Sequence, residues 1–343
     1  MKLPSVRDLP VANKRVLLRT NYDVPLKKFP IKEISDTSRI EESLPTINYL
    51  LSQEAKIIII SHLGRPEGRR VVELSLKPVA KKLTEFLKKE VLLVSKIQAF
   101  KGSKLIMLEN LRFWPEEETN DQDFAKKLAS LVDFYVNDAF AVSHRKHASM
   151  VGIPQFLPSG RRAFGLDFLE EIEALARVRK NPKRPVVVIL GGIKRSKIEA
   201  AKKLVAWADY ILVGGKLIEY DGIPAMVDHH QKILGDLTKN GEDITIKTVE
   251  KFKEAIAKAK TIVWSGPMGA FEDKRFERGT REIAQAVVAS QAYTVVGGGD
   301  TEAALTRFGL VDKIDYISSG GGAMLVFLAE GTLPGIEAIR KLE

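Results

Sequence analysis

Cysteine is absent from the 343 residues of this chain, which excludes disulfide bonds and thiolate chemistry. Aromatic residues make up only 7% of the chain. No uninterrupted apolar run approaches the roughly 18 residues that a membrane span needs, and the segment from Met1 to Asp8 lacks the apolar core of an export signal. We therefore expect a cytoplasmic protein that neither spans a membrane nor is exported.

Positive charge is in excess, with 54 Lys and Arg against 44 Asp and Glu and a formal net charge of +10. This balance favours polyanionic partners, which include nucleic acid, acidic lipid and phosphorylated metabolites, but it does not choose among them. A solvated basic surface with no specific partner fits the composition equally well. The scarcity of aromatic residues that could stack on bases argues against a nucleic-acid-binding protein.

Short β-branched runs bounded by turns recur through both halves of the chain. They predict strands at 15–18, 56–60, 104–108, 132–136, 186–190, 210–213, 261–264, 293–296 and 316–318. Amphipathic stretches between them predict helices at 76–89, 121–131, 198–208, 248–259 and 280–290. Apolar strands that alternate with helices are typical of parallel sheets covered on both faces. The predicted fold class is α/β, with two doubly wound parallel-sheet, Rossmann-like domains.

A charged helical stretch lies between the two groups of strands. It is polar on most sides and is followed by two prolines, which suits a connector between domains better than a core helix. The expected parts are an N-terminal domain, a linker with a hinge helix, a C-terminal domain and a tail that packs back toward the N-terminal domain, at 1–164, 165–185, 186–335 and 336–343.

Basic residues follow the strands of the first half, at the carboxyl ends where ligands collect in open α/β sheets. They are Arg39, His62, Arg65, Arg112, His144, Arg145 and His147. Guanidinium groups bind phosphate and carboxylate bidentately, so several together predict a site for a small, multiply charged anion. Any one of these arginines alone could be an ordinary surface residue. The spacing of His144 and His147 could also suit a metal, but no third ligand cluster supports one.

Glycine follows the strands of the second half instead. The runs are Gly191-Gly192, Gly214-Gly215, Gly297-Gly298-Gly299 and Gly320-Gly321-Gly322. Glycine lets backbone N–H groups approach phosphate oxygens closely, and a helix that starts directly afterwards adds its positive end. Lys194 lies just after the first run and Asp300 follows the third. A carboxylate at that place is a candidate magnesium ligand, a helix cap, or both.

An arginine-rich anion site and a glycine-built site with a lysine and an acid together suggest phosphoryl transfer between two separately bound substrates. Such transfer relies on positioning and on charge neutralisation more than on a protein nucleophile. The chain has neither the Gly-x-x-x-x-Gly-Lys-Ser/Thr loop nor the Gly-x-Gly-x-x-Gly loop, which disfavours P-loop enzymes, protein kinases and dinucleotide-binding proteins.

A series of segments in order makes the sequence resemble the phosphoglycerate kinase family from about Val16 to about Ile339. The matching segments are 17–19, 24–26, 61–66, 108–113, 137–140, 144–149, 264–269, 297–301 and 319–323. The resemblance implies reversible transfer of the acyl phosphate of 1,3-bisphosphoglycerate to Mg-ADP, giving 3-phosphoglycerate and ATP in glycolysis or gluconeogenesis. It implies direct in-line transfer after hinge closure, in a monomer that needs neither nucleic acid nor a membrane.

The resemblance also implies roles for single residues. Phosphoglycerate is expected to contact Asn21, Asp23, Arg39, His62, Arg65, Arg112 and Arg145. The nucleotide is expected to contact Lys194, Lys197, Gly214, Gly215, Pro267, Glu272, Gly297, Gly298, Gly299, Asp300 and Thr301. Within that set Glu272 would reach the ribose and Asp300 would bind the nucleotide's Mg²⁺. Arg39, Lys194 and the helix N-termini at Gly298 and Gly321 would stabilise the transferring phosphoryl group.

The sequence departs from the usual family pattern at four places. Asn21-Tyr22-Asp23 inverts the order of acid and amide, and Ser265 replaces an asparagine. The loop between Lys194 and Lys197 is one residue shorter than usual, and the stretch 216–243 lacks a helix and a strand, which leaves nucleotide preference open. Two alternatives are a catalytically silent relative that binds phosphorylated ligands and a different small-molecule kinase on the same scaffold.

Overall fold

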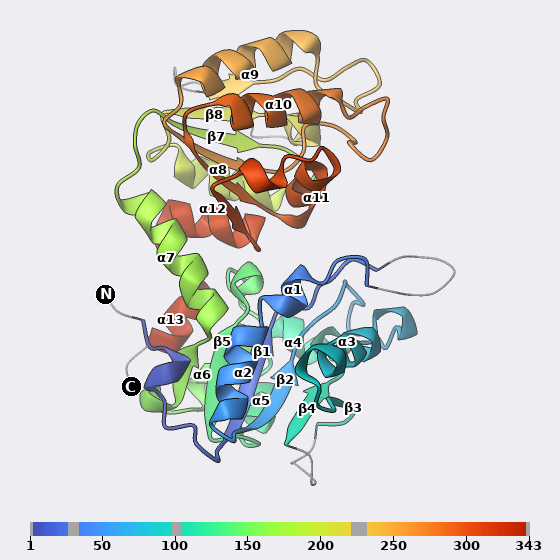
Figure 1. Ribbon diagram of the computed structural model, residues 1–343, viewed down its shortest axis with the longest axis vertical. Helices are drawn as coiled ribbons and strands as arrows, with labels where there is room; N and C mark the ends of the chain where they lie inside the picture. The colour runs from blue at the N-terminus through green and yellow to red at the C-terminus, as the bar shows by residue number, and fades with distance from the viewer. Residues whose placement is uncertain (1–2, 27–33, 98–103, 221–231, 341–343) are drawn as a thin grey trace. The chain divides into compact units, whose positions relative to one another are not determined.

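The computed structural model describes residues 3–26, 34–97, 104–220 and 232–340 and divides the chain into two compact units (Figure 1). The N-terminal unit comprises Met1–Ile172 together with Leu333–Glu343, and the C-terminal unit comprises Glu173–Thr332. The division falls within one helix, α7 (Leu166–Lys180). The end of the chain therefore belongs to the same unit as its beginning.

The N-terminal unit is built on a six-stranded parallel sheet with the order β3-β4-β2-β1-β5-β6. The strands are β1 (Arg15–Thr20), β2 (Lys56–Ile60), β3 (Leu92–Val94), β4 (Leu105–Leu108), β5 (Phe134–Asp138) and β6 (Arg162–Phe164). Arg19 of β1 pairs with Ile60 of β2 and with Asn137 of β5. Because the strands are parallel and in this register, their carboxyl ends meet at one edge of the sheet.

Helices cover this sheet on both faces. They are α1 (Ser38–Glu41), α2 (Leu44–Ser52), α3 (Lys77–Leu87), α4 (Pro115–Thr119), α5 (Gln122–Ala129), α6 (Ile153–Gln155) and α13 (Pro334–Arg340). Val16 and Leu18 of β1 point into one core with residues of α2 and α3. Leu17, between them, is equally buried on the opposite face, as the period of two requires. There α5, α6 and α13 pack around the segment Ala148–Gly152.

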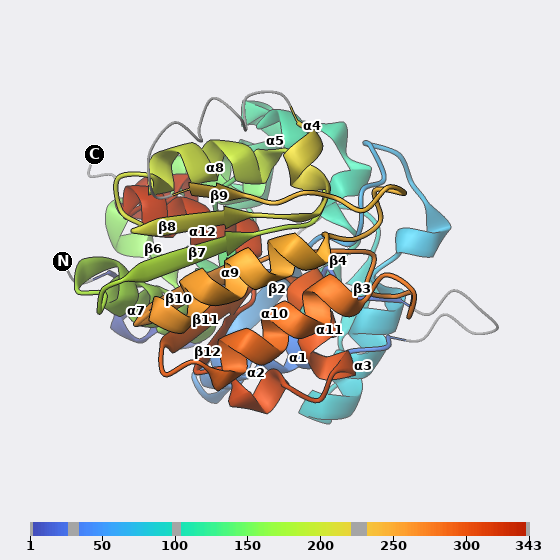
Figure 2. The ribbon, with the colours of Figure 1, turned by 90° about the horizontal axis from the view of Figure 1, so that it is seen from above.

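The C-terminal unit contains a second six-stranded parallel sheet, with the order β12-β11-β10-β7-β8-β9. Its strands are β7 (Val186–Leu190), β8 (Tyr210–Val213), β9 (Lys232–Leu234), β10 (Thr261–Ser265), β11 (Tyr293–Gly297) and β12 (Tyr316–Ser318). Its helices are α8 (Ser196–Leu204), α9 (Ile246–Lys258), α10 (Arg278–Ala289), α11 (Gly299–Arg307) and α12 (Gly321–Glu330). Helices α9 and α10 lie side by side on one face of the sheet, and α8 and α12 on the other (Figure 2).

The predicted α/β class with two doubly wound parallel sheets is confirmed. Every run that predicts a strand corresponds to one in the structure, but β3, β6 and β9 were not predicted. All three are only three residues long and lie at a sheet edge. An edge strand has a neighbour on one side only, so its sequence carries a weaker apolar pattern than a central strand does.

Among residues 3–26, 34–97, 104–220 and 232–340, no single helix is long and apolar enough to cross a membrane. Helices α12 and α13, which are separated by a sharp bend, reach that length and apolarity only when they are counted together.

Candidate active site

The loops after β1, β2, β4 and β5 meet at one edge of the N-terminal sheet, because these four strands are neighbours. Together with α1 they carry a group of side chains that we call the basic cluster: Arg39, His62, Arg65, Arg112, His144, Arg145 and His147. The charges of these side chains shift one another's pKa values. Burial first, and then the charges of Arg112, Arg19 and Arg39, lower the pKa of His62. Burial first, and then the charge of Arg65, lowers the pKa of Arg145. The sequence-predicted arginines and histidines therefore lie in one place.

Arg112 is the most buried arginine of the basic cluster, with 3% of its surface exposed. Its Nη1 donates to the carbonyl oxygen of Gly64 at 2.7 Å, and its backbone N–H is held by the side chain of Asn110 at 3.1 Å. Burial first, and then the charge of Arg145, lower the pKa of Arg112 to about 10. The guanidinium stays charged at neutral pH, and a bound anion would relieve its repulsion from Arg145.

Asp23 ties the loops after β1 and β2 together. Its carboxylate accepts a hydrogen bond from the N–H of Gly64 at 2.7 Å, and its backbone carbonyl accepts one from the guanidinium of Arg39. Asn21, two residues earlier, is 8% exposed, and its Nδ2 has no hydrogen-bond partner within the described ranges. The inverted order of acid and amide thus gives the acid a structural bond and leaves the amide nitrogen available to a ligand.

A buried charged layer lies beneath the basic cluster, and sequence reasoning missed it. Arg19 of β1 and Glu117 of α4 are 1% and 0% exposed, with 3.9 Å between Nη2 and Oε1. Glu117 also accepts from the backbone N–H of Ser149 at 2.9 Å and lies 3.8 Å from Nδ1 of His147. Arg19 lies in a strand and Glu117 is one of three consecutive glutamates, and nothing in the sequence distinguishes either residue from its neighbours as a member of a buried ion pair.

Several buried nitrogen atoms of the basic cluster have no hydrogen-bond partner in the part of the chain that the structure describes, namely Nε of Arg112 and of Arg145 and Nδ1 of His144 and of His147. Burial lowers the pKa of His144 to about 4 and that of His147 to about 3. Neutral imidazoles beside charged guanidinium groups form a site that offers donors to an anion. No group of three or more His, Asp or Glu side chains that could hold a metal ion is found among the described residues.

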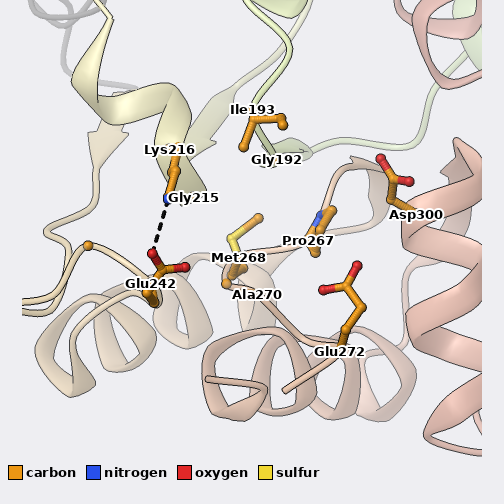
Figure 3. Close-up of a pocket in the computed structure, with 12 residues that line it drawn as sticks. Gly192, Ile193, Gly215, Lys216, Glu242, Pro267, Met268, Ala270, Glu272 and Asp300 are labelled. Carbon is orange, nitrogen blue, oxygen red and sulfur yellow. Dashed lines mark hydrogen bonds and ion pairs between the residues drawn. The ribbon is translucent and has the colours of Figure 1, made fainter. Parts of the chain in front are cut away.

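The C-terminal unit has a pocket of about 290 Å³ at the carboxyl ends of its strands (Figure 3). Its lining residues are Gly192, Ile193, Gly215, Lys216, Gly241, Glu242, Pro267, Met268, Gly269, Ala270, Glu272 and Asp300. Gly215, Pro267, Glu272 and Asp300 belong to the set that the sequence assigned to a nucleotide. The volume suits a small organic ligand.

Asp300 and Lys194 form the charged end of this site. Their side chains are 64% and 56% exposed, with 3.6 Å between Oδ2 and Nζ. Asp300 lies in the first turn of α11, which starts after Gly298. Gly298 has φ of +103°, a conformation that L side chains rarely adopt, and no side chain caps the helix. The first N–H groups of α11 therefore face outward beside the lysine.

Gly321 begins α12 next to the same place. A Cβ at Gly321 would lie 2.6 Å from the carbonyl oxygen of Gly297 and 2.7 Å from Oγ of Ser265. No side chain would fit at position 321, so glycine at this position allows the starts of α11 and α12 to lie close together. The Oγ of Ser265 is buried and has no hydrogen-bond partner in the described residues. An orphaned donor at two helix N-termini is an observation that fits an anionic ligand such as phosphate.

Lys197 differs from Lys194 in its surroundings. It is 9% exposed, and its Nζ donates to the carbonyl oxygens of Gly191 and Ser265, both at 3.0 Å. Burial, together with the charge of Lys194, lowers its pKa to about 8. In this structure Lys197 links the end of β7 to the end of β10. Of these two lysines, Lys194 is the one with its ammonium group at the surface, beside the carboxylate of Asp300.

Three further residues of the predicted nucleotide set do not present a side chain or an open face to the pocket. Thr301 is fully buried and its Oγ1 accepts from the N–H of Gly266 at 2.7 Å. A Cβ at Gly214 would lie 2.6 Å from the sulfur of Met268, and one at Gly297 would lie 2.8 Å from Met324. These three residues pack behind the residues that line the pocket. Lys216 and Glu242, by contrast, line the pocket and were not predicted.

Comparison with known proteins gives consistent matches over nearly the whole chain. The phosphoglycerate kinase family model matches residues 6–220 and 224–331. A phosphoglycerate kinase of Finegoldia magna is 40% identical over 398 aligned positions, covering 99% of each chain. That of Thermosipho africanus is 40% identical over 400 positions, covering 99% of this chain and 98% of the relative. Both alignments are longer than the 343 residues here, so these relatives carry segments that this chain lacks.

Solved structures give the same result. The phosphoglycerate kinase of Coxiella burnetii superposes with a TM-score of 0.78 at 34% identity, covering 98% of this chain and 99% of that one. The phosphoglycerate kinase of Pyrococcus horikoshii superposes with a TM-score of 0.81 at 29% identity, covering 98% of each chain.

Proposed function

The chain belongs to the phosphoglycerate kinase family, and on that premise we propose the roles of its two sites. It is a phosphotransferase that moves phosphate between 1,3-bisphosphoglycerate or 3-phosphoglycerate and an adenine nucleotide. We propose that the basic cluster binds the phosphoglycerate and that the C-terminal pocket binds the nucleotide. We take the enzyme to act as a monomer in the cytoplasm, without nucleic acid or a membrane.

The observation that carries the first assignment is the concentration of positive charge in the basic cluster, for which Glu118, 3.5 Å from Nε of Arg112, supplies only part of the counter-charge. Burial and the charge of Arg145 lower the pKa of Arg112, burial and the charge of Arg65 lower the pKa of Arg145, and the imidazole of His144 is neutral. A ligand with a carboxylate and a phosphate supplies the missing negative charge and accepts from guanidinium pairs. Asn21 offers a further donor for a hydroxyl or carboxyl oxygen of phosphoglycerate.

The second assignment rests on the pocket and the helix starts next to it. Glu272 lines the pocket and would accept hydrogen bonds from ribose hydroxyl groups, and the N-termini of α11 and α12 would bind the phosphates. Asp300 is a single exposed carboxylate, which fits Mg²⁺ because that ion is usually held by one or two carboxylates together with substrate phosphates. The metal supplies charge neutralisation on the phosphate oxygens when it is bound.

In the transfer step the protein positions and neutralises rather than attacks. Lys194 holds the migrating phosphoryl group from the nucleotide side, and Arg39 approaches it from the phosphoglycerate side. The N–H groups that follow Gly298 and Gly321 offer further donors to its oxygens. Closure about α7 brings the two ligands into line and excludes water that would otherwise hydrolyse the acyl phosphate.

The test is a coupled assay with purified protein, MgATP and 3-phosphoglycerate, compared with Lys194→Ala under the same conditions. We expect turnover by the wild-type protein that exceeds the variant's by about 100-fold or more. Wild-type turnover no higher than that of Lys194→Ala would support a catalytically silent, ligand-binding relative instead. Binding of 3-phosphoglycerate, measured by calorimetry, would separate that outcome from misfolded protein.

A further inference from the structure

A charged pair in the nucleotide pocket has no role in the assignments above. The Nζ of Lys216 lies 3.2 Å from Oε1 of Glu242, and both residues line the pocket. Their side chains are 44% and 35% exposed, so both retain open faces toward a ligand. Figure 3 shows this pair at one end of the pocket, with Asp300 and Glu272 toward the other.

Ordered backbone holds both members of the pair. Lys216 lies in a short helix, Gly215–Glu219, directly after β8. Glu242 lies in a turn that is closed by a backbone hydrogen bond of 2.8 Å from the N–H of Thr238 to the carbonyl oxygen of Asp243. The carbonyl oxygen of Glu242 itself accepts from the N–H of Ala270 at 2.9 Å. The carboxylate therefore belongs to the pocket wall rather than to a free surface turn.

The positions of the charged groups along the pocket indicate which part of a nucleotide each end would bind. Phosphates belong at the end with Asp300, because α11 begins there and Lys194 stands beside it. A nucleotide extended from that end passes its ribose along Glu272 and brings its base to Lys216 and Glu242.

We propose that Glu242 and Lys216 recognise the base and that guanine nucleotides are substrates of this enzyme; the proposal rests on the nucleotide assignment above. Guanine presents the acceptor O6 beside the donors N1–H and N2–H₂. A carboxylate accepts from both donors at once, while the neighbouring ammonium group donates to O6. Adenine presents the donor N6–H₂ beside the acceptor N1, so it gives the carboxylate one donor only, and one carboxylate oxygen gains no hydrogen bond from the base.

The experiment measures kcat/KM for MgATP, MgGTP and MgITP with 3-phosphoglycerate held at saturation. Inosine lacks the N2 amino group and keeps O6 and N1–H, so it removes one of the two bonds to the carboxylate. We expect kcat/KM for GTP to equal or exceed that for ATP. We expect it to exceed that for ITP by about tenfold, the effect of one base contact.

Two variants locate the effect. In Glu242→Gln the preference for GTP over ITP should fall from about tenfold to near one, because an amide offers one acceptor in place of two. Glu254→Gln, an exposed carboxylate on α9, is the matched control and should behave as the wild type. Equal melting temperatures of the three proteins would show that the changes in rate do not come from unfolding.

The outcomes separate this proposal from the function on which it rests. Turnover with ATP but a kcat/KM for GTP more than tenfold lower would overturn base recognition by this pair and leave the kinase function standing. A Glu242→Gln variant that slows all three nucleotides equally would also overturn it, because the pair would then be a structural ion pair. The absence of turnover with every nucleotide would reject the kinase function itself.

Discussion

Arg19 and His62 face each other inside the N-terminal unit, with 3.3 Å between Nη2 of Arg19 and Nδ1 of His62. Burial and the charges of Arg112, Arg19 and Arg39 lower the pKa of His62 well below its usual range, so the ring is neutral at pH 7. A guanidinium can only donate, and Nδ1 therefore accepts. The ring proton therefore resides on Nε2, and in the proposed phosphoglycerate site that N–H would be the donor of His62.

This arrangement predicts different effects of two substitutions at His62. The amide nitrogen of glutamine can reach the place of Nε2, whereas that of asparagine corresponds more nearly to Nδ1. We expect His62→Asn to raise the KM for 3-phosphoglycerate by roughly 10- to 100-fold, the loss of one hydrogen bond to a charged ligand, and His62→Gln to raise it much less. Steady-state kinetics checks this. Equal KM values for the two variants would contradict the proposed tautomer.

Glu117 predicts a coupled loss of stability and substrate affinity. It faces Arg19 in a fully buried place, and Glu117→Gln leaves that guanidinium without its counter-charge. Removing one partner of a buried pair costs about 3–5 kcal/mol in the free energy of unfolding. We also expect a higher KM for 3-phosphoglycerate and an unchanged KM for the nucleotide. Urea unfolding and kinetics measure both, with exposed Glu85→Gln as the control; unaltered stability would contradict the prediction.

The sequence predicted the two sheets, and the placing of the candidate site residues at their edges, for one physical reason. Loops at the carboxyl ends of neighbouring parallel strands converge, so His62, Arg112 and Asp300 could be placed at a sheet edge because each follows a predicted strand. Residues whose role depends on which side chain turns inward could not be placed that way. Lys194 and Lys197 are three residues apart with the same chemistry, yet only packing decides that one is exposed and the other buried.

Because of the carboxyl group of Asp167, we expect the free energy of unfolding to fall as the pH rises. Asp167 lies in the first turn of α7 close to Asp138, whose carboxylate accepts from the N–H of Phe168 at 3.1 Å. Burial raises the pKa of both carboxyl groups, and the charge of Asp138 raises that of Asp167 further. The folded state thus keeps a proton that the unfolded chain releases above about pH 4.

The sign follows from this difference in bound protons. Between about pH 4 and the raised pKa of Asp167 the folded state binds more protons, so the free energy of unfolding falls with rising pH, by up to about 1.4 kcal/mol per unit. Asp167→Asn removes the carboxyl group. Its advantage over the wild type in the free energy of unfolding should be larger at pH 8 than at pH 4.5, by at least about 1 kcal/mol. Urea unfolding at both values tests this against exposed Glu173→Gln; a difference independent of pH would refute it.

The two lysines of the loop after β7 predict opposite phenotypes. Lys197→Ala leaves the buried carbonyl oxygens of Gly191 and Ser265 without their donor, which should cost about 2–4 kcal/mol in the free energy of unfolding. Lys194→Ala removes an exposed side chain, so its melting temperature should match the wild type while kcat falls by about 100-fold or more. Thermal unfolding and kinetics on the same preparations separate the two effects. A Lys194→Ala protein that is unstable, or a Lys197→Ala protein that is stable and inactive, would reverse the roles, because the buried ammonium group would then act on the nucleotide rather than on the backbone.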